Sequence, residues 1–195
     1  MSTPGPARPS PGLRLAPFRG LRYVPERVGS LSAVTSPPYD VVVRPDGVRA
    51  LQSADPYNIV RLILPQDGEP AASHAQAAGA LRRWRQEGVL APDPVPALYV
   101  YEQTTPQGDT QRGLIGALRL TTADEKVVLP HEDVMPAPVA DRAGLMRATA
   151  ANLEPLLLAY RGEVDDMAAN AVDRTAQRPP LLCTTTETGC RSTER

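Results

Sequence analysis

The sequence predicts an α+β fold in which two to three helices pack against a mixed or antiparallel sheet. One long segment has the 3.6-residue periodicity of an amphipathic helix, while several short segments are rich in β-branched and aromatic residues. These two kinds of segment do not alternate strictly along the chain. Strict alternation is typical of a doubly wound parallel sheet, so the observed order favours α+β.

The composition is that of an ordinary globular protein and argues against several classes of partner. Of the 195 residues, 42% are hydrophobic and 22% are charged, which suits one sizeable core. A net charge of -1 and an aromatic content of 4% argue against nucleic acid as a partner. The sequence has neither the long apolar run of a membrane span nor the apolar region of a signal peptide. We therefore expect a cytoplasmic protein without a membrane partner.

The first third of the chain is expected to hold a disordered segment followed by short elements. Residues 1–15 are rich in Pro, Ser and Gly, so we expect disorder there and order from residue 16. Val41–Val43 suits a strand or a strand edge, and Pro45–Ser53 suits a short helix with proline in its first turn. The largely apolar run Ile59–Leu64 follows a turn signal and is predicted to be a buried strand.

Residues 71–87 form the clearest helical pattern in the sequence. Apolar residues recur there at three- and four-residue spacing, at Ala77, Ala78, Leu81 and Trp84. Arginine and glutamate occupy the other face, and Gly88 is placed to end the helix as a C-terminal cap. We therefore predict one amphipathic helix that buries its apolar face in the core.

The middle of the chain is predicted to hold three strands, one helix and a further strand. Residues 97–103 and 113–120 suit a pair of strands joined by a turn-rich linker, and a third strand covers 126–129. A helix is predicted from Asp141, as its N-cap, through Asn152, with proline at 155 ending it. Residues 156–160 suit a further strand.

The last part of the chain differs in character from the rest. From about residue 163 the sequence loses periodicity and becomes rich in Thr, and both cysteines, Cys183 and Cys190, lie in it. Two cysteines without a metal-binding spacing predict neither a metal site nor a disulfide framework. We therefore expect an ordered region over 16–161 and a divergent, flexible tail over 162–195.

The densest cluster of ionisable residues is His131-Glu132-Asp133, between the predicted strand and the predicted helix. In an extended segment His131 and Asp133 would share a face, where a carboxylate can orient an imidazole that carries a proton. The same pair could ligate a metal, but a site needs a third ligand and the only other histidine, His74, lies on a separate helix. We therefore assign no metal ligand, and a polar loop without chemistry is the alternative.

Arg142 follows this cluster in the first turn of the predicted helix. Its planar fork could bind a phosphate or a carboxylate, with the free amides of that turn adding to the attraction. The alternative is an exposed arginine paired with Asp141 or with Glu132.

A second candidate block is Pro37-Pro38-Tyr39-Asp40, which two prolines make rigid. Rigidity suits the presentation of Tyr39 and Asp40 to a ligand in a cleft, but it also suits a corner of the chain. Arg61, farther along, could face a carboxylate ligand or water. We therefore treat Tyr39, Asp40, Arg61 and Asp133 as candidate ligand-binding residues.

Five blocks occur in an order and at a spacing that resemble a known family. They are APFRGLR, SPPYDVV, DPYNIVRL, LYVYEQ and HEDVMPAPVADRAGLMRATAANLEPLLLAY, between about residues 16 and 161. Together they resemble the N-terminal half of the bacterial and archaeal domain-of-unknown-function family 1015 (DUF1015). The resemblance implies a cytoplasmic protein without a settled activity.

The resemblance also implies a candidate activity. Family members are about twice this length, and a DGHHR-type block in their second half is similar to the nucleotide-contacting box of ParB-like folds, including CTPases and free-serine kinases. That similarity implies a nucleotide, with or without a divalent metal, as ligand or cofactor. His131, Glu132 and Arg142 match the first polar block of the family. The second block is absent here, so we expect a truncated member.

Three hypotheses for function follow. In the first, Arg142 holds a phosphate while His131 or Glu132 takes a proton during phosphoryl transfer. In the second, the chain is a non-catalytic interaction module or a vestigial fragment that self-associates through an exposed apolar face. In the third, a metal-dependent hydrolase uses His131 and Asp133. The sequence does not decide whether the protein is an enzyme.

Overall fold

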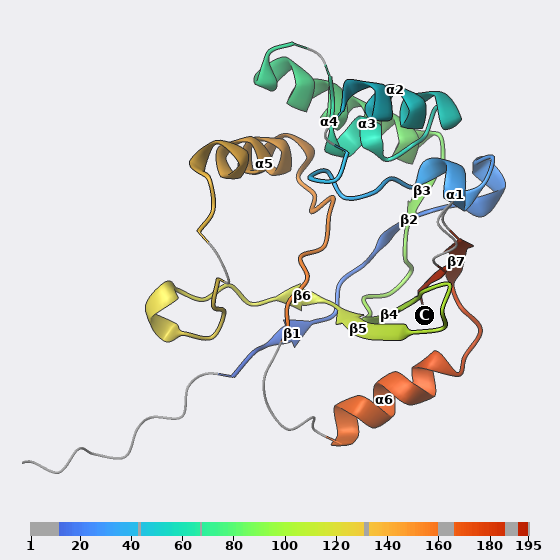
Figure 1. Ribbon diagram of the computed structural model, residues 1–195, viewed down its shortest axis with the longest axis vertical. Coiled ribbons are helices and arrows are strands. Elements are labelled where there is room, and N and C mark those ends of the chain that lie inside the picture. The colour runs from blue at the N-terminus through green and yellow to red at the C-terminus, as the bar shows by residue number, and fades with distance from the viewer. Residues whose placement is uncertain are drawn as a thin grey trace, which may run out of the picture.

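The computed structural model describes residues 12–42, 44–66, 68–130, 133–159, 166–185 and 191–194. Its helices and short antiparallel strand pairs confirm the predicted α+β fold. Figure 1 shows α2 (Pro45–Ala54), α3 (Val60–Ile63) and α4 (Pro70–Gln86) packed together at one end of the molecule, with α5 (Pro136–Thr149) beside them. The sheet that contains β4 (Tyr99–Thr104) and β5 (Thr110–Ile115) lies nearer the other end, where α6 (Asp166–Ala176) runs alongside it.

The elements follow one another without strict alternation of strand and helix. In chain order they are β1 (Leu15–Ala16), β2 (Leu21–Tyr23), η1 (Pro25–Arg27), α1 (Leu31–Val34), α2 (Pro45–Ala54), α3 (Val60–Ile63), α4 (Pro70–Gln86), β3 (Leu90–Pro92), β4 (Tyr99–Thr104), β5 (Thr110–Ile115), β6 (Ala117–Leu118), η2 (Ala123–Glu125), α5 (Pro136–Thr149), α6 (Asp166–Ala176), β7 (Leu182–Thr185) and β8 (Arg191–Glu194).

All the strand pairs of the described residues are antiparallel. β1 pairs with β6, β2 pairs with β3, and the largest sheet has the order β5-β4-β8-β7. The predicted hairpin is confirmed as β4 and β5, in register from Tyr99 opposite Ile115 to Thr104 opposite Thr110. Its second strand covers Thr110–Ile115 and not the predicted 113–120. β8 lies on the other side of β4, and β7 pairs with β8. The described part of 162–195 therefore contributes a helix and two strands of this sheet.

The predicted amphipathic helix is confirmed as α4, and its apolar face forms the centre of the core. Trp84 is 1% exposed and packs in a cluster of buried residues from α3, α4 and the start of β3. The rings of Tyr57 and Tyr23 lie 5.7 Å and 6.3 Å from the Trp84 ring, so the only tryptophan joins three segments. Gly88 follows the helix with a φ of 71°, a left-handed conformation that suits glycine after a helix end.

The prediction of a strand over 59–64 is wrong, because Val60–Ile63 is the short helix α3. The buried side chain of Asn58 explains the difference. Its Oδ1 accepts a hydrogen bond from the backbone N–H of Val60 at 3.0 Å, which starts the helical turn. Its Nδ2 donates to the carbonyls of Ala33 and Thr35, both at 2.8 Å. These tertiary hydrogen bonds outweigh the strand preference of the apolar run.

Other predicted boundaries and strands also differ from the structure. Residues 126–129 form no strand, since η2 ends just before them with Lys126 in a left-handed conformation at φ 53°. Residues 156–159 form no strand either. Val41 and Val42 lie outside any strand, and residue 43 lies outside the described residues. The helix predicted from Asp141 begins at Pro136, so that Asp141 is an interior residue rather than the N-cap. The helix predicted over Pro45–Ser53 is confirmed as α2.

A polar network joins β2 and the end of β3 to the large sheet. Asp93 accepts hydrogen bonds from the guanidinium of Arg22 and from the hydroxyl of Tyr99, and the backbone N–H of Gly20 donates to that hydroxyl at 2.7 Å. Asp93 and Tyr99 are 8% and 3% exposed. The hydrogen bond from Arg22, helped by that from Tyr99, lowers the pKa of Asp93 against the opposing effect of burial. We call Gly20, Arg22, Asp93 and Tyr99 the Asp93 network.

Candidate functional site

Arg142, one of the predicted site residues, is the centre of a polar cluster that joins α5 to α3 and to the loop after α1. Its Nη1 donates to the carbonyl of Ile63 at 2.6 Å, and its Nε and Nη2 donate to Oδ2 of Asp141 at 3.1 Å and 2.6 Å. The carboxylate of Glu154 lies 3.8 Å away. The guanidinium carbon lies 4.7 Å from the centre of the Tyr39 ring, which is a cation–π contact. The guanidinium is thus engaged both along its edges and over one face.

His74 of α4 completes this cluster from the opposite helix. Its Nε2 lies 2.9 Å from Oδ1 of Asp141, and because an ionised carboxylate only accepts, the ring donates through Nε2. α5 approaches the ring closely at Gly144, where a Cβ would lie 2.7 Å from Cε1 and 2.9 Å from Nδ1 of His74. The ring is therefore held between a carboxylate and a helix backbone. We call Tyr39, His74, Asp141, Arg142 and Glu154 the Arg142 cluster.

The pKa values of the two carboxyl groups of the Arg142 cluster are shifted in opposite directions from their usual values. Partial burial acts to raise the pKa of Asp141, but the hydrogen bonds from Arg142 and His74 outweigh it and leave the pKa lowered. Burial raises the pKa of Glu154, and the charge of Asp40 adds to this, against a hydrogen bond from the backbone and the attraction of Arg142. Glu154 is thus the carboxyl of the cluster whose charge is less well compensated.

The Arg142 cluster fixes the loop that carries the Pro37-Pro38-Tyr39-Asp40 block. The backbone N–H of Tyr39 donates to Oε1 of Glu154 at 3.2 Å, while the Tyr39 ring lies under the guanidinium of Arg142. Residues 39–41 form a turn, and the N–H of Val41 donates to the carbonyl of Pro38 at 3.0 Å. Through these contacts the cluster sets the position of the residues that flank Tyr39.

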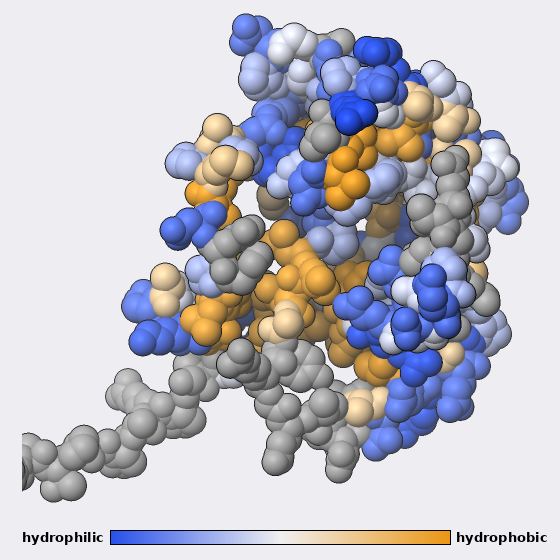
Figure 2. All heavy atoms as spheres, in the orientation of Figure 1, coloured by the Kyte–Doolittle hydropathy of each residue, from blue (hydrophilic) through white to orange (hydrophobic). Residues whose placement is uncertain are grey.

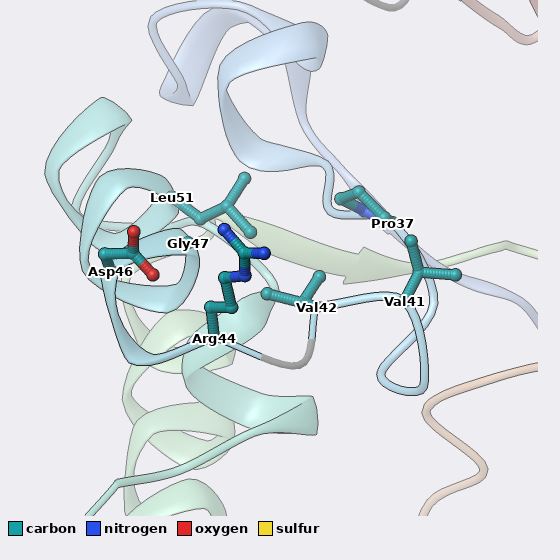
Figure 3. Close-up of a pocket in the computed structure, with 7 residues that line it drawn as sticks. All are labelled: Pro37, Val41, Val42, Arg44, Asp46, Gly47 and Leu51. Atoms are coloured by element: carbon teal, nitrogen blue, oxygen red, sulfur yellow. The ribbon is translucent and has the colours of Figure 1, made fainter.

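Those flanking residues form one wall of a pocket of about 380 Å³. Figure 3 shows the pocket between this loop and the first turns of α2, with the guanidinium of Arg44 directed in among the apolar side chains. It is lined by Pro37, Val41, Val42, Arg44, Asp46, Gly47 and Leu51. The lining is mainly apolar with one group of each charge, and the side chain of Arg44 forms no ion pair with a described residue. This combination resembles the general make-up of small-molecule sites, in which a few polar groups orient a ligand on apolar walls.

The structure brings only some of the predicted site residues together. Tyr39 and Arg142 are in contact, and Asp40 is exposed on the same turn as Tyr39. Arg61, on α3, donates from Nη2 to the carbonyl of Gln52 at 2.7 Å, and its buried Nε has no hydrogen-bond partner among the described residues. Asp133 is exposed just before α5.

The other two predicted residues, His131 and Glu132, lie outside the described residues. Within the part of the chain that the structure describes, no three His, Cys, Asp or Glu residues lie close enough to hold a metal ion. In the same part, no helix is long and apolar enough to cross a membrane.

Sequence reasoning missed three residues that the structure places at or beside the site. His74 lies on the amphipathic helix α4 and Glu154 lies just after α5, so nothing in their spacing indicates that they meet at Arg142. Arg44 had a local signal that could have been used. It stands directly before the proline that begins α2, where the first amides of a helix have no partners within the helix.

The geometry on its own defines a two-part site, an internally bonded polar cluster and an adjoining pocket. The family model described as "Protein of unknown function (DUF1015)" matches residues 15–193, so the chain belongs to this family. The match runs past residue 161, where the sequence resemblance was expected to end, and covers α6 and β7 and most of β8. No curated protein and no solved structure matches the chain.

Proposed function

We propose that this chain binds a small phosphate-bearing ligand, of which a nucleotide is the leading candidate, in the pocket between the Tyr39 loop and α2. The observation that carries the proposal is the guanidinium of Arg44, an exposed side chain that lines an apolar-walled pocket and forms no ion pair with a described residue. A guanidinium matches the geometry of phosphate oxygens and can donate two hydrogen bonds to them. The walls of Val41, Val42 and Leu51 offer apolar contact to the rest of the ligand.

The start of α2 supports an anionic ligand in this pocket. Pro45 occupies the first helical position, and the following amides of Asp46 and Gly47 belong to the turn whose N–H groups have no helical acceptors. The partial positive charge at this helix end adds to the charge of Arg44. Two of these residues, Asp46 and Gly47, line the pocket itself.

Asp46 gives the proposal a second, metal-dependent part. Its carboxylate lines the same pocket and would repel a phosphate that arrives without a counterion. Mg²⁺ is commonly bound through one or two carboxylates together with the phosphates of a nucleotide. We therefore expect the ligand to bind more tightly with Mg²⁺ than without it.

The Arg142 cluster has a positioning role in this proposal. Arg142 and Glu154 hold Tyr39, and Tyr39 lies within two residues of the lining residues Pro37 and Val41. The hypothesis that Arg142 itself holds a phosphate, with His131 or Glu132 as proton acceptor, remains as an alternative. The two readings predict different effects of single substitutions.

The test is a calorimetric titration of the full chain with ATP, with and without Mg²⁺. Arg44→Ala removes a charge-assisted hydrogen bond of about 1.5–3 kcal/mol, so we expect the Kd to rise about tenfold or more. Arg49→Ala is the matched control, since Arg49 is an exposed arginine of the same helix that does not line the pocket. Asp46→Asn should remove most of the Mg²⁺ dependence.

Arg142→Ala separates the two readings of the site. If Arg142 acts through the Tyr39 loop, this variant binds ATP more weakly than the native chain but still depends on Arg44. Loss of binding in Arg142→Ala together with native affinity in Arg44→Ala would place the phosphate at Arg142 and reject the pocket. Equal losses in Arg44→Ala and Arg49→Ala would show only general attraction of an anion to arginine.

A further inference from the structure

α5 carries an apolar stripe on a side that faces away from the core. Met135, Val139 and Met146 recur at spacings of four and seven residues, which places them on one side of the helix. Arg142 shares this side, but its guanidinium turns to the carbonyl of Ile63 and the ring of Tyr39. They are 71%, 49% and 47% exposed, whereas Leu145, on a different side, is 3% exposed. A surface helix ordinarily has charged or polar residues where it meets water. The stripe is therefore an apolar side of α5 without a covering element in the described structure.

A run of three leucines follows α5 and is also exposed. Leu156 and Leu157 are 88% and 85% exposed, and Leu158 is 46% exposed. Consecutive exposed leucines are unusual in a monomeric protein, although single ones are common. Figure 2 shows hydrophobic side chains gathered on the viewed face below the position of α5, around a hollow. We call Met135, Val139, Met146, Leu156, Leu157 and Leu158 the apolar face.

The area of the apolar face is comparable to what a stable interface needs. Full burial of one Leu, Val or Met side chain, worth about 1.5–3 kcal/mol, corresponds to roughly 60–120 Å² at about 25 cal/mol per Å². The six side chains, together with Leu129 and Val134, which are both 69% exposed, therefore present several hundred Å². A standard interface buries about 800 Å² per partner, of which roughly 55–65% is apolar. The apolar face supplies an area of this order.

The charges at the two ends of α5 indicate which partner fits. Asp133 stands just before the helix and Arg147 in its last turn, and both are exposed. Neither forms an ion pair with a described residue. The helical stretch from Pro136 to Arg147 alone spans about 17 Å. In an antiparallel pair of α5 helices, each Asp133 would lie at the end of the partner helix that carries Arg147, and the face would be complementary to itself.

We infer that the apolar face binds a second copy of this chain, with the two α5 helices antiparallel about a twofold axis. Such an interface uses the same patch on both subunits, which is the commonest arrangement of protein dimers. The net charge of -1 places little overall repulsion between two copies. The apolar stripes meet at the centre, and the Asp133 and Arg147 pairs lie at the rim.

The first experiment measures the mass of the full chain by light scattering after size-exclusion chromatography, over a range of concentrations. We expect a species of twice 20.9 kDa that dissociates on dilution. Val139→Asp and Leu157→Asp should each give a monomer with an unchanged circular dichroism spectrum, because both side chains are already exposed in the monomer. Val95→Asp is the control, since Val95 is 63% exposed but lies outside the apolar face, and it should leave the dimer intact.

A charge exchange tests the antiparallel arrangement independently of the apolar substitutions. Asp133→Arg places like charges at both rim contacts and should raise the dimer dissociation constant about tenfold, since two exposed pairs are affected at once. Combining it with Arg147→Asp restores opposite charges and should return the constant to near its native value. A monomer at every concentration, or dimers that survive both aspartate substitutions, would overturn the inference. Failure of the double variant to recover would reject the antiparallel arrangement.

Discussion

The two polar clusters of this protein are built from the same kinds of residues but have different surroundings. In the Asp93 network a carboxylate that is almost completely buried takes hydrogen bonds from Arg22 and Tyr99 and joins strands of two sheets. In the Arg142 cluster the side chain of Asp141 is 41% exposed. Its carboxylate accepts a hydrogen bond from His74 and so joins α5 to α4. We infer from this comparison that the buried carboxylate of Asp93 stabilises the contact between two sheets. The partly exposed carboxylate of Asp141 belongs to a cluster that positions a loop beside a pocket.

The largest expected effect that tests this comparison is the removal of the buried carboxylate. Asp93→Ala removes the buried carboxylate that accepts hydrogen bonds from the Arg22 guanidinium and the Tyr99 hydroxyl, so we expect a loss of about 3 kcal/mol in the free energy of unfolding. Asp141→Ala removes a partly exposed carboxylate and should cost about 1 kcal/mol or less. Urea unfolding of both variants measures the difference. A larger loss for Asp141→Ala would show that the Arg142 cluster, and not the Asp93 network, contributes more to the stability of the fold.

A smaller loss of stability is expected when the glycine at each cluster is replaced by alanine. A Cβ at Gly20 would lie 2.8 Å from the Tyr99 hydroxyl and 3.0 Å from Oδ2 of Asp93, so Gly20→Ala should cost about 2 kcal/mol by overpacking a rigid network. A Cβ at Gly144 would lie 2.7 Å from the His74 ring. Gly144 lies inside α5, where alanine favours the helix by about 1 kcal/mol, so the net loss in Gly144→Ala should be under about 1 kcal/mol.

The control for these glycine variants is Gly79→Ala. Gly79 lies inside α4, and the nearest atom to an added Cβ is 3.9 Å away on the flexible side chain of Arg82. We expect this variant to be more stable than the native chain by about 0.5–1 kcal/mol, through helix propensity alone. Thermal unfolding of the three variants under one condition gives the ranking. A destabilised Gly79→Ala would mean that glycine is required in these helices for another reason.

The smallest expected effect is a difference in pH dependence. The pKa of Glu154 is raised above 4.5, so the folded state holds its proton longer than the unfolded state, and stability falls as pH rises from 4.5 through the folded pKa. The pKa of Asp93 is lowered below 3.8, so its contribution is present above pH 3.8 and is lost as pH falls through its folded pKa. Glu154→Gln should abolish the first change and leave the second.

This pH prediction is checked by urea unfolding midpoints of the native chain and of Glu154→Gln, measured at a series of pH values on both sides of the two ordinary pKa values. Asp40→Asn serves as a second variant, because the charge of Asp40 contributes to the raised pKa of Glu154. Asp40→Asn should narrow the pH range, between 4.5 and the folded pKa of Glu154, over which stability falls, without removing this fall. Identical pH profiles for all three proteins would show that Glu154 is not held in the environment described for it.

Two of the five residues of the Arg142 cluster, Tyr39 and Arg142, could be predicted as site residues from the sequence. The rigid Tyr39 block and Arg142 were selected as candidates because their local sequences indicate a fixed loop and a cation near a helix. The contact between Tyr39 and Arg142 at 4.7 Å could not be derived from the sequence. The two residues are about a hundred positions apart, and their local sequences do not indicate that they are neighbours in the fold. His74 and Glu154 were missed for the same reason, because each has an ordinary local context and acquires its partner only through packing.

The sequence by itself determined the elements whose evidence lies within a few residues. α4 follows from apolar spacing, α2 from a proline suited to the first turn of a helix, and the β4–β5 hairpin from two strand-like segments around a turn-rich linker. Only the tertiary structure decided that residues 60–63 are helical and that β8 lies beside β4. Hydrogen bonds from Asn58 to distant carbonyls and the pairing of a late strand are long-range contacts. They contribute free energy only after the chain has folded around them, and no local pattern contains them.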